Sequence, residues 1–84
     1  MADMKDILAK RLRKCRNEAD LPQIKVAIYC NITEKAYQSY ELGTHEPRVS
    51  TLMKIAQFFN VSMDYLIGLT DDPTPYPRSP NSPE

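Results

Sequence analysis

Apolar residues recur every three or four positions through most of the chain, and residues that stop helices divide this pattern into five short runs. Such spacing places apolar side chains on one face of an α-helix, whereas strands require alternation. The first run predicts a helix over residues 4–19 and consists of Met4, Leu8, Leu12, Cys15 and Ala19. The pattern therefore predicts an all-α fold, with five helices around one core.

A second helix is predicted over residues 22–29, because Pro22 fits the first turn of a helix and would break a later one. Its inward residues are Ile24, Ala27 and Ile28. Asn31 tolerates the left-handed backbone conformation and is expected to end this helix. Thr33 then provides an N-cap for a third helix, which Gly43 stops. The apolar residues of the third helix are Ala36, Tyr37 and Tyr40.

Two further helices complete the predicted fold. Ser50 is expected to cap a fourth helix that ends at Asn60. Its inward residues are Leu52, Ile55, Ala56 and Phe59. Ser62 is expected to cap a fifth helix, with Asp64 in its first turn and Gly68 at its end. Its inward residues are Leu66 and Ile67.

Proline separates the end of the chain from the rest. The last 12 residues hold five of the seven prolines, namely Pro73, Pro75, Pro77, Pro80 and Pro83. Residues 1–70 are therefore predicted to form one domain, and residues 71–84 a flexible, mostly disordered Pro-rich tail. Two alternatives stay open for the tail: Tyr76 docks on the domain, or the tail is a peptide ligand for a partner.

The chain has 11 basic and 11 acidic residues and thus no formal net charge, yet these charges are unevenly distributed. Residues 1–16 contain six basic and two acidic residues, which gives this segment a net charge of +4. The basic residues are Lys5, Lys10, Arg11, Arg13, Lys14 and Arg16. They could attract phosphate or form only the solvated face of the first helix, so overall neutrality neither supports nor excludes a nucleic-acid ligand.

The two helices between Gln23 and Gly43 are joined by a tight turn, which is the layout of a helix-turn-helix motif. Ala27 provides a small side chain where the two helices must approach closely. Tyr37 and Tyr40 are expected to lie in the core or at its edge rather than to stack on bases. The outward face of the second helix of the motif carries polar groups suited to the edges of DNA bases. These groups belong to Glu34, Lys35, Gln38 and Ser39.

Several spaced motifs between residues 5 and 70 keep a single register. They are Leu21 and Gln23 followed by Ala27, then Tyr40, Glu41 and Gly43, then Glu46 and Pro47, then Leu52, Ile55 and Ala56, and last the segment from Val61 to Gly68. In these motifs the chain resembles the Cro/cI-type helix-turn-helix domain of the xenobiotic-response-element family of bacterial and phage regulators. The resemblance implies a five-helix, lambda-repressor-like fold.

The resemblance also implies a transcriptional regulator, of repressor type, that binds double-stranded DNA with the helix after Thr33 in the major groove. Base readout would fall to Glu34, Lys35, Gln38 and Ser39. Phosphate contacts that set the register would fall to Gln23, Thr33, Thr44, His45 and Arg48. Basic residues of the first helix would reach phosphate only if that helix faces the DNA. These are Lys10, Arg13, Lys14 and Arg16.

Three residues depart from the family pattern. Pro22 stands where the family often has Ser or Thr and so removes a hydroxyl cap, and Asn31 replaces a frequent Gly at small cost. Tyr37 is bulkier than the usual branched aliphatic residue. Two outcomes are open for it: the third helix sits differently, or Tyr37 is partly exposed.

Other classes of function find little support in the sequence. Cys15 and Cys30 are too few for a disulfide scaffold and are expected to be buried thiols. One His and no Cys-x-x-Cys motif predict no metal site, and no other cofactor is indicated. A chain of 84 residues has little room for a deep catalytic pocket, so no enzyme activity is predicted. Without a signal peptide or an apolar stretch of ~20 residues, the protein is expected to be cytoplasmic and not membrane-bound.

Two hypotheses about partners follow. A homodimer on a pseudo-palindromic site, with half-sites roughly 34 Å apart, would use apolar residues near the end of the domain. These are Phe58, Met63, Tyr65 and Leu69. The alternative is a protein-interaction module on the same fold, such as an adaptor or antirepressor, which the single basic residue of the reading face and the Pro-rich tail motivate. No small-molecule ligand is indicated.

Overall fold

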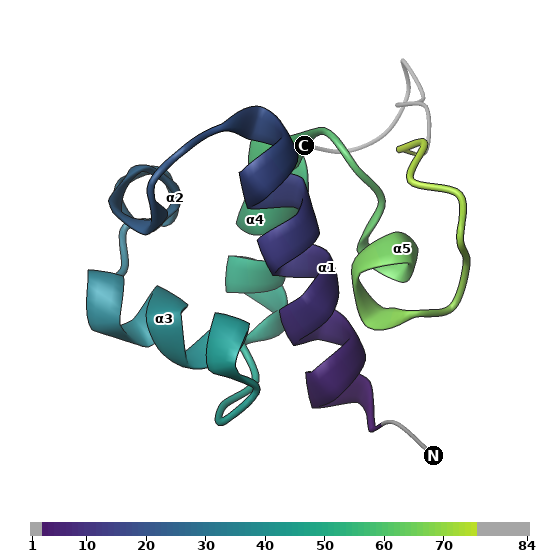
Figure 1. The fold of residues 1–84 in the computed structure, drawn as a ribbon, viewed down its shortest axis with the longest axis horizontal. Helices are drawn as coiled ribbons and strands as arrows, with labels where there is room; N and C mark the ends of the chain where they lie inside the picture. The colour runs from purple at the N-terminus through teal and green to yellow at the C-terminus, as the bar shows by residue number, and fades with distance from the viewer. Residues whose placement is uncertain (1–2, 76–84) are drawn as a thin grey trace.

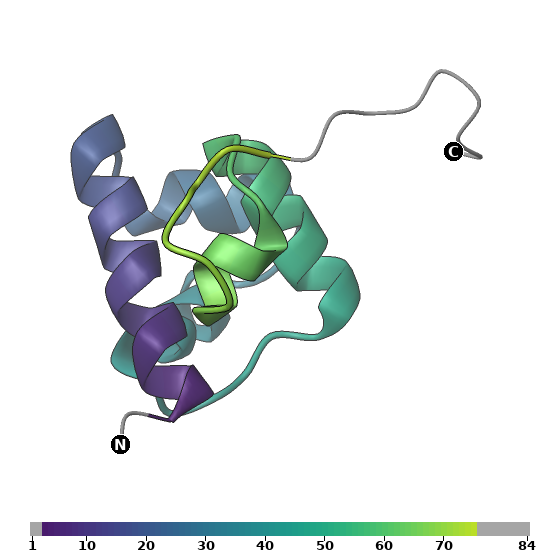
Figure 2. The same cartoon turned by 90° about the vertical axis from the view of Figure 1, so that its right-hand side faces the viewer.

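The computed structural model describes residues 3–75, and this part of the chain forms five α-helices and no strand. The helices are α1 (Met4–Ala19), α2 (Gln23–Cys30), α3 (Glu34–Leu42), α4 (Val49–Phe59) and α5 (Met63–Ile67). In Figure 1, α1 passes through the middle of the molecule, with α2 and α3 on one side of it and α5 on the other. Figure 2 turns α5 toward the viewer, in front of α1 and α4, with both of which it packs. The predicted all-α fold is confirmed.

Hydroxyl groups cap two of the helix starts as the sequence predicts. Thr33 and Ser62 each accept a hydrogen bond of 3.0 Å from the backbone N–H three residues later. The predicted cap at Ser50 is wrong, because α4 already begins at Val49. Arg48 occupies the N-cap position of α4 and makes no capping hydrogen bond with its side chain.

Each of the five helices ends at a residue with a left-handed backbone conformation. These residues are Asp20, Asn31, Gly43, Asn60 and Gly68. The backbone N–H of the following residue donates to the carbonyl oxygen five positions earlier, which makes every ending a Schellman motif. Gly68 is also fixed by packing, since a Cβ atom there would lie 2.8 Å from Cγ2 of Ile7. The stops predicted at Asn31, Gly43, Asn60 and Gly68 are confirmed.

The core draws side chains from all five helices. Its largest fully buried members are Tyr37, Leu8, Leu12, Ile55, Leu66, Val26 and Cys30. Tyr37 is thus part of the core, and its bulk does not expose it. Its hydroxyl makes no hydrogen bond of standard geometry with the described residues. Burial, and next the nearby Glu41 carboxylate, raise the pKa of this hydroxyl.

Three parts of the predicted apolar pattern are wrong. Met4 and Ala19, at the two ends of the predicted stripe of the first helix, are exposed. Ile24 and Ile28 are 38% and 67% exposed, because the inward face of α2 is formed by Val26, Ala27 and Cys30. At 100° per residue these two sets lie on different sides of the helix. Tyr65, predicted to lie on a dimer surface, is buried in the core at 5% exposure, so it cannot contribute to such a surface.

The chain beyond α5 packs back on the helices. Arg11 donates to the carbonyl oxygen of Thr70 at 2.6 Å and pairs with the carboxylate of Asp71 at 2.7 Å. The carbonyl oxygen of Pro73 accepts a hydrogen bond of 3.0 Å from the N-cap residue of α5. Ordered contacts therefore extend past the predicted domain boundary, while the rest of the predicted tail, with Tyr76, lies outside the described residues.

Three further properties bear on function. No helix among residues 3–75 is both long and apolar enough to cross a membrane. Over the same residues no cluster of His, Cys, Asp or Glu could hold a metal ion. Cys15 and Cys30 are free and buried as predicted, and burial raises the pKa of both thiols.

Candidate nucleic-acid interface

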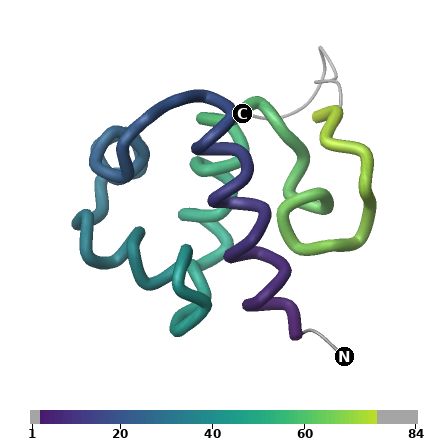
Figure 3. Tube along the Cα trace, viewed as in Figure 1, coloured from purple at the N-terminus to yellow at the C-terminus, as the bar shows by residue number. Residues whose placement is uncertain are grey.

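The helices α2 and α3 form the predicted helix-turn-helix, and Figure 3 traces the short turn that joins them. Asn31 has φ of 57°, and the backbone N–H of Ile32 donates to the carbonyl oxygen of Ala27 at 3.0 Å. Ala27 is fully buried, as expected where the two helices meet. Because each of these groups fixes the turn locally, α3 has a defined orientation relative to α2.

A buried ion pair fixes α3 to α1. The side chain of Glu41 in α3 is only 3% exposed and accepts two hydrogen bonds from Arg16, from Nε at 2.6 Å and from Nη2 at 2.9 Å. Arg13 donates to the backbone carbonyl oxygen of the same Glu41. Burial alone would raise the pKa of Glu41, but the hydrogen bonds, that from Arg16 first, lower it below its ordinary value. Glu41 is therefore an ionised, structural carboxylate.

Sequence reasoning missed this role of Glu41. The residue was part of the motif Tyr40, Glu41 and Gly43, but the motif gave it no function. A usable signal was its position one helical turn after Tyr37, on the inward side of α3. A carboxylate predicted to be buried requires a cation, and the basic residues of α1 were the available source.

Two glutamines extend this network to the outer side of α3. Gln23, at the start of α2, donates from Nε2 to Oε1 of Glu41 at 3.1 Å. Gln38 in turn donates from Nε2 to Oε1 of Gln23 at 3.3 Å. The hydrogen bonds therefore run from exposed Gln38 through half-buried Gln23 to buried Glu41. Gln23, predicted as a phosphate contact, lies in contact with both of these α3 side chains.

The four residues predicted to read bases differ in how far their polar groups are free to contact DNA. Glu34, Lys35 and Gln38 are exposed, and the first two make no ion pair within residues 3–75. Ser39 is half-buried, and its hydroxyl donates to the carbonyl oxygen of Ala36 at 2.6 Å. That bond leaves the Ser39 oxygen with acceptor capacity alone.

An open hollow lies between α3 and the loop that follows it. Its lining residues are Thr33, Lys35, Ala36, Ser39, Tyr40, His45, Glu46 and Arg48. Five of the nine predicted contact residues thus meet at one surface. The four that are not part of this hollow are Gln23, Glu34, Gln38 and Thr44. Thr44 supports the loop, since its hydroxyl donates to the carbonyl oxygen of Ser39 at 3.2 Å and lies 3.2 Å from Nδ1 of His45.

The arginines of α1 are engaged within the protein. Besides Arg13 and Arg16, Arg11 donates to the carbonyl oxygen of Tyr65 at 2.6 Å and lies 4.3 Å from the centre of its ring. Lys14 lies 3.4 Å from the Tyr65 hydroxyl and 3.9 Å from Glu18. Arg13 and Arg16, two of the residues that would reach phosphate only if this helix faced the DNA, thus both donate to Glu41 of α3.

Comparison with known proteins identifies the family. Residues 12–66 match the helix-turn-helix family HTH_3. Over 61 residues, 73% of this chain, the sequence is 41% identical to the uncharacterized HTH-type transcriptional regulator YqaE of Bacillus subtilis, of which it covers 53%. Over the same share it is 38% identical to the HTH-type transcriptional regulator ImmR of Bacillus subtilis, of which it covers 48%.

A third relative comes from another organism. The chain is 33% identical over 61 residues to the cryptic phage CTXphi transcriptional repressor RstR of Vibrio cholerae, of which it covers 55%. The chain thus spans about half the length of these curated relatives. No solved structure shows significant similarity to it. Since the family match covers more than half of the chain and includes α2 and α3, the protein belongs to the helix-turn-helix family of the Cro/cI, or xenobiotic-response-element, type.

Proposed function

We propose that the protein binds double-stranded DNA sequence-specifically and acts as a transcriptional repressor, with α3 in the major groove. The observation that carries this proposal is the two-sided character of α3. Tyr37 and Glu41 anchor one side in the core, while Glu34, Lys35 and Gln38 are exposed on the other. The names of ImmR, a transcriptional regulator, and RstR, a transcriptional repressor, support the same function. DNA as the ligand also supports a cytoplasmic location and a role without catalysis.

Gln38 is proposed to read adenine, and the hydrogen bonds around Gln23 supply the reason. Ionised Glu41 can only accept, so Gln23 turns its amide nitrogen toward it and its oxygen toward Gln38. Gln38 must then donate, which leaves its own oxygen and one N–H free. Adenine presents the matching pair in the major groove, N6–H as donor and N7 as acceptor. The opposite amide orientation would leave two donors free and would favour guanine.

The remaining contacts divide between bases and phosphates. Lys35 can donate to guanine, and Glu34 can accept from cytosine while repelling phosphate. Ser39 retains only its acceptor capacity for a base. Contacts with the phosphates are proposed for residues around the hollow between α3 and its following loop. These are Thr33, Thr44, His45 and Arg48.

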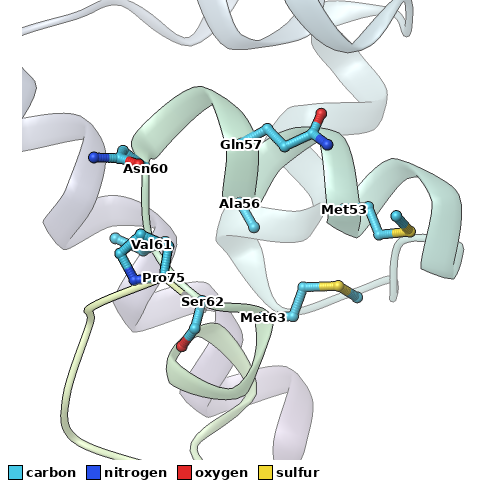
Figure 4. Close-up of a pocket in the computed structure, with 8 residues that line it drawn as sticks. All are labelled: Met53, Ala56, Gln57, Asn60, Val61, Ser62, Met63 and Pro75. Carbon is cyan, nitrogen blue, oxygen red and sulfur yellow. The ribbon is translucent and has the colours of Figure 1, made fainter. Parts of the chain in front are cut away.

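A homodimer is the proposed assembly, with the second copy on the groove between α4 and α5. This groove contains Met53, Ala56 and Met63, and Figure 4 shows both methionine side chains on the same side of Ala56. Met53 is 47% exposed, and Leu69, which the sequence placed on the dimer surface, is 73% exposed. Sedimentation equilibrium should show a dimer that Met53→Glu weakens at least about tenfold, since the carboxylate would be desolvated. An unchanged dimer would contradict this assignment of the interface.

Selection of bound duplexes from a random pool tests the DNA-binding proposal as a whole. The expected result is a two-fold symmetric consensus, with half-sites roughly 34 Å apart and an adenine opposite Gln38. Affinity for the selected duplex should fall steeply as salt is raised. Failure to bind any duplex at about 50 mM salt would reject DNA binding and favour the protein-interaction alternative.

A further inference from the structure

The outer surface of α2, with the adjoining part of α4, has properties that neither the core nor the proposed DNA contacts explain. Ile24, Ile28 and Tyr29 are 38%, 67% and 50% exposed. The Tyr29 ring packs against Phe58 of α4, with centroids 5.1 Å apart. We call this surface the α2–α4 face. It comprises Ile24, Lys25, Ile28, Tyr29, Lys54 and Phe58.

The exposed residues of this face are not needed to hold α2 in place. Val26, Ala27 and Cys30 are fully or almost fully buried and already pack this helix on the core. Residues 24 and 28 are one helical turn apart, so their side chains lie beside each other on the outer surface. Two adjacent isoleucines at the surface form an apolar contact area that solvent does not favour.

The charged residues that α2 and α4 contribute to this face are both cationic, while Glu18 of α1 lies beside Phe58 at its edge. The sequences of α2 and α4 contain Lys25 and Lys54 but no Asp or Glu. Neither lysine makes an ion pair with any residue between 3 and 75. Lys54 lies one turn before Phe58 on α4 and near Cys30 of α2, where burial raises the pKa of the thiol and the Lys54 charge partly opposes this. The positive charges therefore border the apolar area on both helices.

We infer that the α2–α4 face binds an amphipathic helix of a partner protein that carries acidic residues beside its apolar stripe. The apolar stripe would cover Ile24 and Ile28, whose spacing of one turn matches the ridges of a second helix. Its carboxylates would pair with Lys25 and Lys54, which have no such partner within the described chain. The phosphates of DNA would satisfy the lysines but not the exposed isoleucines.

Chemical-shift mapping with the full chain tests this inference. The probe is a synthetic helical peptide of about 18 residues, with Leu at helical spacing and Glu on its other faces. A matched peptide carries Lys in place of Glu. The acidic peptide should bind saturably, with a Kd below about 1 mM, and shift the amide signals of α2 and of α4 around Lys54. Equal binding of both peptides, or no saturable binding of the acidic one, would overturn the inference.

A matched pair of variants tests whether the acidic peptide binds at this face rather than elsewhere on the surface. Ile28→Ser should weaken acidic-peptide binding about tenfold, because the apolar contact is lost. Val49→Ser is the control, since Val49 is 69% exposed and lies outside the face. Replacing both lysines, Lys25→Glu and Lys54→Glu, should reverse the preference in favour of the basic peptide.

Two further measurements show whether a second copy of the chain or DNA occupies the α2–α4 face instead of an acidic helix. If Ile28→Ser weakens self-association in sedimentation instead of peptide binding, a second copy occupies the face and the inference fails. If a random duplex shifts the same amide signals as strongly as the acidic peptide does, the face is a DNA contact and the inference fails. Because Ile28 is not among the proposed DNA contacts, selected-duplex binding by Ile28→Ser distinguishes failure of this inference from failure of the proposed function.

Discussion

Helices α1 and α3 use charge in opposite ways. The arginines of α1 supply half of the basic residues of the N-terminal segment, yet Arg11, Arg13 and Arg16 all donate to groups of the protein itself. The only basic residue of α3 is Lys35, and it is exposed on the outer side of the helix. A run of basic residues in a sequence is therefore a poor guide to a basic surface, because guanidinium groups also satisfy buried carboxylates and carbonyl oxygens.

Loss of the Arg16 side chain should cause the largest loss of stability. Arg16→Met would leave the Glu41 carboxylate, 3% exposed, without its charge partner. The free energy of unfolding should fall by about 3–5 kcal/mol, as is usual when one member of a buried pair is removed. Thermal and urea denaturation measure this change. Lys10→Met is the control, expected to change stability by less than about 0.5 kcal/mol, and equal losses for both variants would disprove the structural role of α1.

The same ion pair predicts a dependence of stability on pH. Hydrogen bonds lower the pKa of Glu41 in the folded protein relative to the unfolded chain. Its contribution to stability is therefore complete above the unfolded pKa of about 4.3 and is lost as the pH falls through the folded pKa. Urea denaturation between neutral and acidic pH should show this loss in the wild type. The Glu41→Gln variant should not show this loss of stability at acidic pH. If the stabilities of the wild type and the variant fall in parallel with pH, Glu41 is not ionised in the folded protein.

Substitution of Gln23 tests how the exposed side of α3 recognises DNA, because Gln23 is hydrogen-bonded to Gln38. Gln23→Met keeps the side-chain length but removes the group that orients Gln38. Discrimination in favour of adenine at one position should fall by about 1–3 kcal/mol, while the fold is retained. Competition between duplexes that differ at this base measures the loss. Lys35→Ala should relax a different position, and an unaltered adenine preference in Gln23→Met would refute the proposed orientation.

Substitution of Arg48 tests whether this residue contacts the DNA backbone rather than a base. Arg48→Ala should weaken binding to all duplexes alike and reduce the slope of log affinity against log salt by about one. Titrations at several salt concentrations, with the selected duplex and a random one, provide the comparison. A loss confined to the selected sequence would show that Arg48 contacts a base.

Ser39 should show the smallest effect. Its hydroxyl bonds back to the carbonyl oxygen of Ala36, so Ser39→Ala should change stability by less than about 0.5 kcal/mol. Relaxed base preference in a duplex selection would show that its remaining acceptor capacity is used on DNA. An unchanged preference would remove Ser39 from the readout residues.

Local signals in the sequence were sufficient to locate the five helices, although the start of α4 lacks the predicted Ser50 cap. Caps such as Thr33 and stops such as Asn31 act through hydrogen bonds to neighbouring backbone, so their effect depends little on the remainder of the fold. The face of a short helix is harder to predict. Over the eight residues of α2, Ile24 and Ile28 formed as good an apolar stripe as Val26 and Cys30, and only packing distinguishes the two.

The candidate site was predictable only where local helical geometry decides the position of a side chain. The outward position of Glu34, Lys35 and Gln38 follows from helical geometry within α3. The pairing of Glu41 with Arg16 joins residues 25 positions apart, and helical periodicity does not contain that information. Contacts between distant segments decide which polar residues are structural and which remain free to bind.

The Schellman endings of all five helices have a consequence for how the chain folds. Each ending is completed by residues no more than five positions apart, so the point at which each helix stops is encoded locally. Local order of this kind keeps the loop-closure entropy of folding small. Temperature-jump relaxation should therefore find folding in the range of microseconds to milliseconds, as in other small helical domains.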